Sequence, residues 1–441
     1  MSHRVVLTTT NEDQGVSRSA SPAPANASGA IRGAGALIDQ CIVSGASFCT
    51  VVILSRFAGQ QQLGMYALAF SLLVLTTGIQ TALILNPYTV FFPREPDAQR
   101  VNLTGSTLLQ SALFSLVAAA LFLAGYMVLK ANAIDHVWIA LAISITLPAV
   151  LLRNAVRRMC FAQLRFGRSI VVDTIAVVAR FLIFGVLVSR GELSAWNALL
   201  AIGFSDAIAS AAYLLYKRGD IGIEATRWQL DAVRNWRFGR WTALSQTVYV
   251  SQSYSVHWLL GVFCDTAAIG GYMMCTSIVQ LAGPLVQGAG NGITPLVSKA
   301  FAEGGLASLS KITWACATWV GAAALAYMAT MFFGSSFLLS SAYGNGLESF
   351  ENVLIVLAVG FGATAMGMPA SKALTVLERT NLNFVINLIA LIITAFVASA
   401  FAATGDLFGA ACGVCIGFVA ACGLRWGTYF RVRRSYAEGT Q

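Results

Sequence analysis

The sequence predicts an all-α integral membrane protein with about twelve transmembrane helices in two six-helix repeats. Composition, the lengths of the apolar runs and an internal repeat indicate this fold class. Hydrophobic residues make up 57% of the 441 residues and charged residues 11%, against roughly 25% in soluble domains. The mean hydropathy is +0.71. The apolar runs do not alternate with polar residues, as transmembrane β-strands would, so the spanning elements are predicted to be helices.

The predicted spans follow one another along the whole chain. A spanning helix needs about 20 mostly apolar residues, and windows of this kind are separated by charged residues or by Gly, Pro and Asn. They are rich in small residues, which allow helix backbones to pack closely in a bilayer. The predicted spans cover residues 36–55, 63–85, 105–129, 137–152, 169–189, 195–216, 241–262, 267–290, 312–333, 352–371, 382–402 and 407–426.

The second half of the chain repeats the first at low identity. A shift of 206 residues without gaps places Gly64 on Gly270 and aligns the tetrapeptide LGMY with IGGY. The register holds across two apolar spans and the link between them, which indicates two homologous halves. Each half has six predicted spans, so both enter the membrane from the same side, as parallel repeats with a substrate site between them. Other identical pairs are Gln40 and Gln246, Ser47 and Ser253, Leu54 and Leu260, Phe57 and Phe263, Tyr66 and Tyr272, Ser71 and Ser277, and Leu75 and Leu281.

The distribution of positive charge predicts the orientation of the chain. Of the 28 lysines and arginines, Arg56, Lys130 and Arg190 fall in predicted outer links, Arg180 falls within a span, and the others fall in predicted cytoplasmic segments. Both termini are therefore predicted to be cytoplasmic. The net charge of +9 reflects this bias towards the anionic inner leaflet and requires no nucleic-acid partner. The nine cysteines show no metal-binding or disulfide pattern.

The predicted domain organisation follows from these spans. Residues 1–30 are polar, lack the apolar core of a signal peptide and are expected to form a disordered cytoplasmic tail. An N-lobe covers 31–216, a C-lobe covers 241–428, and 429–441 form a cytoplasmic C-terminal tail. Residues 217–240 form a basic amphipathic cytoplasmic linker, with Trp228 and Trp236 on one helical side and Arg227 and Arg234 on another. A helix lying in the membrane interface and a solvated link both fit this pattern.

A family resemblance is carried by four stretches, ILSRFAGQQQLGMYALAFSLLVL, RRMCFAQLRFGRS, FGRW and AAIGGYMMCTSIVQLAGPLVQGAGNGITPLVSKAF. These stretches resemble polysaccharide flippases of the multidrug, oligosaccharidyl-lipid and polysaccharide (MOP) exporter superfamily. The resemblance implies a V-shaped, MATE-like bundle of two lobes that alternates between inward and outward openings. It also implies that the cargo is an undecaprenyl-diphosphate-linked oligosaccharide. The expected role is transport across the bacterial inner membrane for O-antigen or exopolysaccharide synthesis, with polysaccharide polymerase or export machinery as further partners.

Two opposite charges lie within predicted spans, where charges are costly and usually functional. Arg180 in the fifth span and Asp206 in the sixth lie at similar depths, because the two helices run antiparallel. Arginine can bind a phosphate through two parallel hydrogen bonds, which makes Arg180 a candidate ligand for the diphosphate. The two residues could form a permanent ion pair that locks the lobe, or a pair that opens for a diphosphate or a proton.

Further polar residues lie near the predicted cytoplasmic mouth, where they could bind sugar hydroxyls or be satisfied by water between helices. Arg32 and Arg240 precede the first span of each half and could attract the diphosphate or set the topology. Asp39 is also a candidate site for H⁺ or Na⁺. His257, toward the outer end of the seventh span, could titrate near neutral pH or hydrogen-bond between helices. The residues at the mouth are Asp39, Gln80, Asn86, Asp173, Gln246, Gln287 and Asn291.

Three function classes fit the composition, and a flippase is favoured. A cation-coupled multidrug or organic-cation antiporter would favour an acidic and aromatic pocket over an intramembrane arginine. A polymerase or ligase would need catalytic groups on a large outer loop, and the longest predicted outer link, 334–351, offers Glu348 and Glu351 without His or Arg. No GxxxxGK[ST] phosphate-binding loop occurs. The expected energy source is an H⁺ or Na⁺ gradient or the membrane potential, and neither a cofactor nor enzymatic activity is expected.

Overall fold

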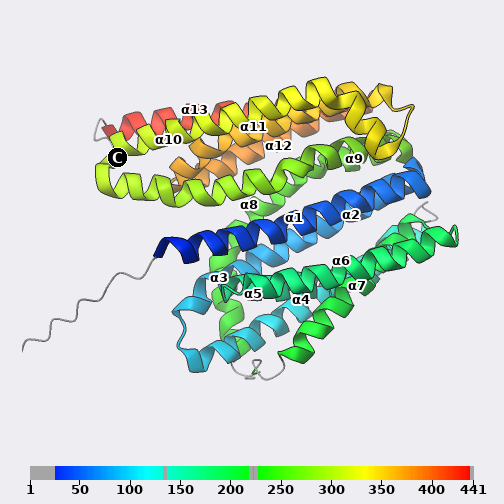
Figure 1. Cartoon of the computed structure of the whole chain (residues 1–441), viewed down its shortest axis with the longest axis horizontal. Helices are drawn as coiled ribbons and strands as arrows, with labels where there is room; N and C mark the ends of the chain where they lie inside the picture. Colours follow the sequence, from blue (N-terminus) through cyan, green and yellow to red (C-terminus); the bar gives the residue numbers. More distant parts are fainter. Residues whose placement is uncertain (1–24, 133–136, 218–221, 223–226, 438–441) are drawn as a thin grey trace, which may run out of the picture.

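The computed structural model describes residues 25–132, 137–217, 222 and 227–437, and within these ranges the chain is helical, with no β-strand (Figure 1). The all-α fold class is thus confirmed. Helix α1 begins at Ala25, so residues 1–24 of the predicted N-terminal tail lie outside the described residues. At the other end, α13 continues to Ala437, through most of the predicted C-terminal tail.

The N-lobe is built from six long helical segments. Its second segment is composite: α2 (Gln60–Gln80) passes through a π-helical turn, η1 (Thr81–Leu85), into α3 (Asn86–Phe91) and η2 (Phe92–Arg94). Pro87 follows the π-helical turn and has no backbone N–H, which suits an interruption of the regular hydrogen-bond ladder. The other helices of this lobe are α1 (Ala25–Phe57), α4 (Asp97–Ala131), α5 (Trp138–Ala162), α6 (Phe166–Ser189) and α7 (Ala195–Tyr216).

The C-lobe contains one helix that turns back on itself. The backbone of α10 leaves the helical region at Gly304 and Gly305, and Gly305 has a φ of 58°, which glycine adopts without steric cost. Figure 1 shows the direction of α10 reversing at this point. The elements of this lobe are α8 (Arg227–Phe263), α9 (Thr266–Val279), η4 (Gln280–Ala282), α10 (Gly283–Tyr343), η5 (Glu348–Phe350), α11 (Glu351–Val376), α12 (Thr380–Ala402) and α13 (Leu407–Ala437).

Among the described residues, 10 helical segments are long and apolar enough to cross a membrane. One of them, Thr266–Tyr343, contains the reversal and therefore holds two of the predicted spans. Helix α8 is not among the 10, because its second half, which corresponds to the seventh predicted span, is uncharged but interrupted by Gln, Ser, Tyr and His residues. Each predicted span therefore coincides with a helix. Apolar side chains such as Phe333, which is 86% exposed, cover the outside of the bundle, as a lipid-facing surface requires.

The two lobes meet at the predicted outer end of the bundle. The largest buried apolar cluster joins both lobes, with Leu63 from the N-lobe and Ile269 from the C-lobe among its members. Toward the end where α1 begins, the clusters around Met159 and around Ile293 each belong to one lobe. In Figure 1 the lobes draw together at one end and separate toward the start of α1. The structure is therefore the V-shaped bundle of two lobes that the family resemblance implies.

A reciprocal glycine contact forms the joint between α2 and α9. A Cβ atom on Gly64 would lie 1.7 Å from the Thr266 carbonyl oxygen, and one on Gly270 would lie 2.1 Å from the Gln60 carbonyl oxygen. The shift of the internal repeat that aligns Gly64 with Gly270 also aligns Gln60 with Thr266. The contact is therefore self-complementary, as at a two-fold axis, and glycine is needed on both sides for the backbones to approach.

Helix α8 combines part of the predicted linker with the seventh span in one continuous helix. Its first turns pack against the N-lobe, where Glu95 accepts a hydrogen bond from Arg234 Nη1 at 2.8 Å and lies 3.4 Å from Arg227 Nη2. Gly239 allows α8 to approach the π-helical turn, since a Cβ there would lie 2.6 Å from the Ala82 carbonyl oxygen. From Arg227 onwards the linker is thus part of a helix that contacts both lobes.

Replacing Glu95 by glutamine is expected to weaken this attachment in a pH-dependent way. The hydrogen bond from Arg234 holds the pKa of Glu95 below its usual value. Such a carboxylate stabilises the fold above its unfolded-state pKa, and this contribution is lost as the pH falls through the folded-state pKa. In Glu95→Gln we expect a loss of about 1 kcal/mol or less at neutral pH, and a smaller difference from wild type in acid. Thermal unfolding at both pH values tests this, and a difference independent of pH would contradict it.

Candidate functional site

A chain of alternating charges runs through the interior of the N-lobe, and we call it the charge chain. It connects helices α1, α5, α6 and α7. At its centre, Asp173 accepts hydrogen bonds from Arg153 Nη2 at 2.8 Å and from Arg157 Nε at 2.7 Å. Its members, in order of contact, are Asp39, Arg157, Asp173, Arg153, Asp206 and Arg180.

Both ends of the charge chain are also ion pairs. Arg157 Nη2 donates to Asp39 Oδ2 at 2.7 Å, which ties α5 to α1. Asp206 Oδ1 lies 3.0 Å from Arg153 Nη1 and 3.3 Å from Arg180 Nη2. All three carboxylates are buried, and a charge removed from water needs such partners to be tolerated. The negative charges of the N-lobe interior are therefore neutralised within the protein.

The contact between Arg180 and Asp206 agrees with the similar depths expected from the sequence. Arg153 and Arg157 were not expected there, because the predicted fourth span ended at residue 152 and placed both in a cytoplasmic link. Helix α5 instead continues to Ala162. The sequence contains a signal for this longer helix, a series of apolar residues at intervals of about one helical turn, which the structure shows to be buried. They are Leu147, Leu151, Ala155 and Met159.

A cavity of about 690 Å³ lies beside the charge chain, between the lobes, at the end where α1 begins and α5 ends. Its N-lobe wall carries Asn154, Arg157 and Arg158 from α5, and its C-lobe wall is residues 284–292 of α10. Arg158 makes no hydrogen bond or ion pair with any residue in the described part of the chain. Because the carboxylates of the charge chain are all paired, the free charge on this wall is positive.

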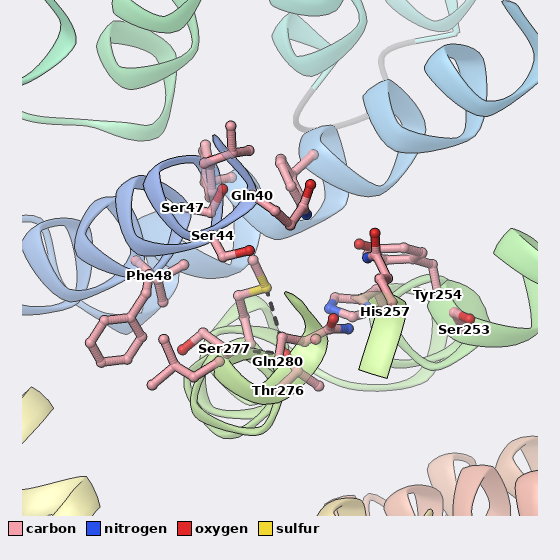
Figure 2. Close-up of a pocket in the computed structure, with 18 residues that line it drawn as sticks. Gln40, Ser44, Ser47, Phe48, Ser253, Tyr254, His257, Thr276, Ser277 and Gln280 are labelled. Atoms are coloured by element: carbon pink, nitrogen blue, oxygen red, sulfur yellow. Dashed lines mark hydrogen bonds between the residues drawn. The ribbon is translucent and has the colours of Figure 1, made fainter. Parts of the chain in front are cut away.

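A second cavity, of about 220 Å³, adjoins the first, and Figure 2 shows the residues that line it. Gln40 and Gln287 line both cavities. The smaller cavity has no Asp, Glu, Lys or Arg among its lining residues, and its polar groups are mainly hydroxyls and amides. Figure 2 shows Ser44 and Ser47 of α1 on one side and Thr276 of α9 on the other. Such groups can exchange hydrogen bonds with sugar hydroxyls.

No family model and no curated protein matches the sequence, but solved structures match the fold. A MOP superfamily transporter from Pyrococcus furiosus, described as having a binding pocket of reverse polarity, has a TM-score of 0.67 at 14% identity, over 92% of this chain and 95% of that one. The lipid II flippase MurJ, in an inward closed conformation, has a TM-score of 0.71 at 10% identity, over 90% of this chain and 89% of that one. The fold is that of the MOP-superfamily transporters. An inward-facing multidrug resistance MATE family transporter also matches, with a TM-score of 0.65 at 14% identity, over 91% of this chain and 94% of that one.

Within this MOP fold, Gln80 supports the cavity wall from behind. It is buried, its Nε2 donates to the Leu151 carbonyl oxygen at 3.0 Å, and its Oε1 accepts from Asn154 Nδ2 at 2.9 Å. Gln80 therefore orients Asn154, which lines the larger cavity. Asn86 begins α3, directly after the π-helical turn. Neither Gln80 nor Asn86 lines the two cavities.

The other residues that the sequence analysis proposed for the site lie at different places in this MOP fold. Gln287 lines both cavities and His257 lines the smaller one. Gln246 packs against α2 and Arg240 is exposed beside Trp241, and neither lines the cavities. Two further candidates lie in helices whose side chains at those positions are outside the described part of the structure, Arg32 in α1 and Asn291 in α10.

Proposed function

We propose that this protein is a flippase that moves undecaprenyl-diphosphate-linked oligosaccharide units across the bacterial inner membrane by alternating access, for surface polysaccharide synthesis. The observation that carries the proposal is Arg158, a cation without an ion-pair partner among the described residues, on the wall of the larger cavity beside Arg157 and Asn154. A diphosphate is the part of this cargo that cannot cross hydrocarbon unaided. Arginine offers it charge-assisted, two-pronged hydrogen bonds.

The arrangement of the cavities fits the other parts of the same cargo. The smaller cavity offers hydroxyl and amide groups without a fixed charge, which suits a neutral or weakly charged glycan. The V-shaped separation of the lobes leaves room for an isoprenoid tail to remain in lipid. In this proposal the basic segments, both termini and the open end of the V face the cytoplasm. The described conformation is then the one that loads cargo.

The membrane potential suits outward movement of such a cargo. An inside-negative potential favours export of negative charge by about 2.3 kcal/mol per charge per 100 mV. A diphosphate therefore gains free energy on leaving the cytoplasmic side. Coupling to an H⁺ or Na⁺ gradient is the alternative drive within this proposal, and polymerase or export machinery would receive the glycan on the outer side.

A second candidate function is a cation-coupled antiporter for organic cations. The observation that favours it is Asp39, whose Oδ1 has no hydrogen-bond partner in the described part of the chain. Aromatic residues such as Phe48 and Tyr254 also line the smaller cavity and could stack on a cation. Against it, Asp39 Oδ2 already pairs with Arg157, and the free charge on the larger cavity repels cations.

Flipping of a fluorescent undecaprenyl-diphosphate sugar in proteoliposomes tests the proposal. We expect Arg158→Gln to slow flipping by about tenfold or more, the loss of one charged hydrogen bond, and Arg158→Lys to retain part of the rate. Arg433→Gln removes an exposed arginine at the end of α13 and is expected to flip at the wild-type rate. Equal rates in Arg158→Gln and wild type would contradict the role of Arg158. A wild-type protein that expels cationic dyes but moves no lipid-linked sugar would establish the antiporter instead.

A further inference from the structure

The C-lobe contains a buried arginine without an acidic partner. Arg425 lies on α13 and is 9% exposed. Its Nη2 donates to Asn387 Oδ1 on α12 at 2.7 Å, whereas Nε has no hydrogen-bond partner among the described residues. No carboxylate in the described part of the chain forms an ion pair with it. The neutral amide of Asn387 is thus the hydrogen-bond partner that the described residues offer to the Arg425 guanidinium, which can donate several hydrogen bonds.

The contrast with the N-lobe is one of charge balance. Each arginine of the charge chain meets at least one buried aspartate. In the described part of the C-lobe the carboxylates lie in the terminal turns of helices, in the links between helices or at the reversal of α10, and none of them pairs with Arg425. They are Asp231, Asp265, Glu303, Glu348, Glu351, Glu378 and Asp406. A cation removed from water without an opposite charge costs several kcal/mol, so a partner from outside the chain would relieve a large penalty.

The surroundings of Arg425 are shaped to hold this side chain. Gly367 on α11 leaves space for it, since a Cβ there would lie 3.2 Å from Arg425 Nη1. Phe418 on α13 and Tyr249 on α8 line a cavity of about 160 Å³, whose lining shares Gln280 and Gln287 with the 220 Å³ cavity. Arg425 follows Phe418 on α13 by seven residues, or two helical turns, so the two side chains lie on the same face of that helix. Arg425 therefore lies about two turns from the C-lobe side of the path between the lobes, on the helix face that lines it.

We propose that Arg425 and Asn387 form a second anion site, which binds an oxyanion of the cargo. The nature of the cargo rests on the proposed function. With this site the C-lobe binds the same anionic cargo that Arg158 contacts from the N-lobe. Two oxyanions share the required chemistry, a phosphate of the diphosphate and the carboxylate of an acidic sugar. Both accept paired hydrogen bonds from a guanidinium, and Asn387 contributes its amide N–H once its oxygen is held by Arg425.

The decisive variant is Asn387→Asp, which supplies the missing carboxylate from within the protein. Its oxygen would take the place of Asn387 Oδ1, which accepts from Arg425 Nη2. The new ion pair is expected to raise the unfolding temperature without added anions and to exclude an external oxyanion. Arg425→Gln removes the cation directly, but a lower stability alone could explain its effect. The two variants therefore act on the same site with opposite expected effects on stability.

Anion binding to the full-length protein in detergent provides the measurement. Inorganic pyrophosphate and glucuronate are the probes, titrated against chloride at equal ionic strength, in an Arg158→Gln background so that only the C-lobe site is followed. We expect Asn387→Asp to weaken binding of at least one probe by about tenfold or more. Loss for pyrophosphate alone identifies the diphosphate as the ligand, and loss for glucuronate alone identifies an acidic sugar. Unchanged binding of both probes overturns the proposal and leaves Arg425 a structural residue.

A transport arm separates this inference from the proposed function. Flipping of lipid-linked glycans with and without a glucuronate is compared in wild type and Asn387→Asp, both with Arg158 intact. If the wild-type protein flips the lipid and Asn387→Asp flips at least one of the two lipid-linked glycans more slowly, both proposals stand. If wild type flips both glycans and Asn387→Asp matches it, the flippase stands and the second site fails. If probe binding depends on Asn387 but no lipid is flipped, the site stands as an anion site and the proposed cargo is wrong.

Discussion

Asp173→Asn is expected to cost about 3–5 kcal/mol of unfolding free energy, the usual result of removing one member of a buried ion pair. Asp173 is fully buried and accepts hydrogen bonds from both Arg153 and Arg157. An asparagine of the same shape leaves the three arginines of the charge chain with only two carboxylates. Thermal unfolding in detergent can be followed with a thiol-reactive dye, because Cys160 and Cys275 are free and buried.

Two further variants sharpen this test. Asp97→Asn removes an exposed carboxylate that pairs with Arg100 in the first turn of α4, and we expect a change of about 1 kcal/mol or less. Asp173→Asn combined with Arg153→Gln leaves two complete pairs, so part of the lost stability should return as a coupling energy. If Asp173→Asn unfolds at the wild-type temperature, Asp173 is not charged in the folded protein and the charge chain does not hold the helices together.

Gly64→Ala is expected to disfavour the described conformation by about 2 kcal/mol or more, the cost of overpacking a close contact. The added Cβ would lie 1.7 Å from the Thr266 carbonyl oxygen, so α2 and α9 must move apart. These helices belong to different lobes, and their separation opens the predicted outer end. The population closed at that end should therefore fall. Gly270→Ala is expected to act in the same way, because it would meet the Gln60 carbonyl oxygen at 2.1 Å.

Distances between spin labels on the two lobes can measure this shift. Arg190 in the N-lobe and Thr404 in the C-lobe are exposed at the predicted outer end and are suitable label sites. Gly125→Ala is the matched control, because nothing lies within 4 Å of a Cβ at that position, and it should leave the distance distribution unchanged. A Gly64→Ala protein with the wild-type distribution would show that α2 and α9 do not form the closure.

The charge chain and the glycine joint have different roles in an alternating mechanism. The charge chain joins α1, α5, α6 and α7, so the N-lobe can rotate as one body. The joint between α2 and α9 is a backbone contact without ion pairs, which can separate without uncovering a buried charge. Arg158 and Arg425, on opposite lobes, would then contact an anionic cargo in the cavity while the joint opens.

The sequence by itself determined the class of protein, the spans and the repeat. In a bilayer every backbone group must be bonded within its own helix, so the length of an apolar run reveals a span directly. The repeat register pairs Gly64 with Gly270, which form the joint. Antiparallel helices also placed Arg180 and Asp206 at one depth. Each of these inferences depends on a local pattern or on a single alignment, and each needs no knowledge of how helices pack.

Only the tertiary structure decided which polar groups meet. Arg157 and Arg158 are adjacent in sequence, yet Arg157 joins the charge chain and Arg158 pairs with no carboxylate in the part of the chain that the structure describes. Neighbouring residues on a helix point about 100° apart, and the orientation of α5 relative to Asp39 of α1 and Asp173 of α6 determines which of the two meets a carboxylate. Arg425 shows the same limit, because the lack of an acidic partner among the described residues depends on which helices surround α13. Charge at a position can be read from sequence, but its neutralisation depends on contacts between helices that are distant along the chain.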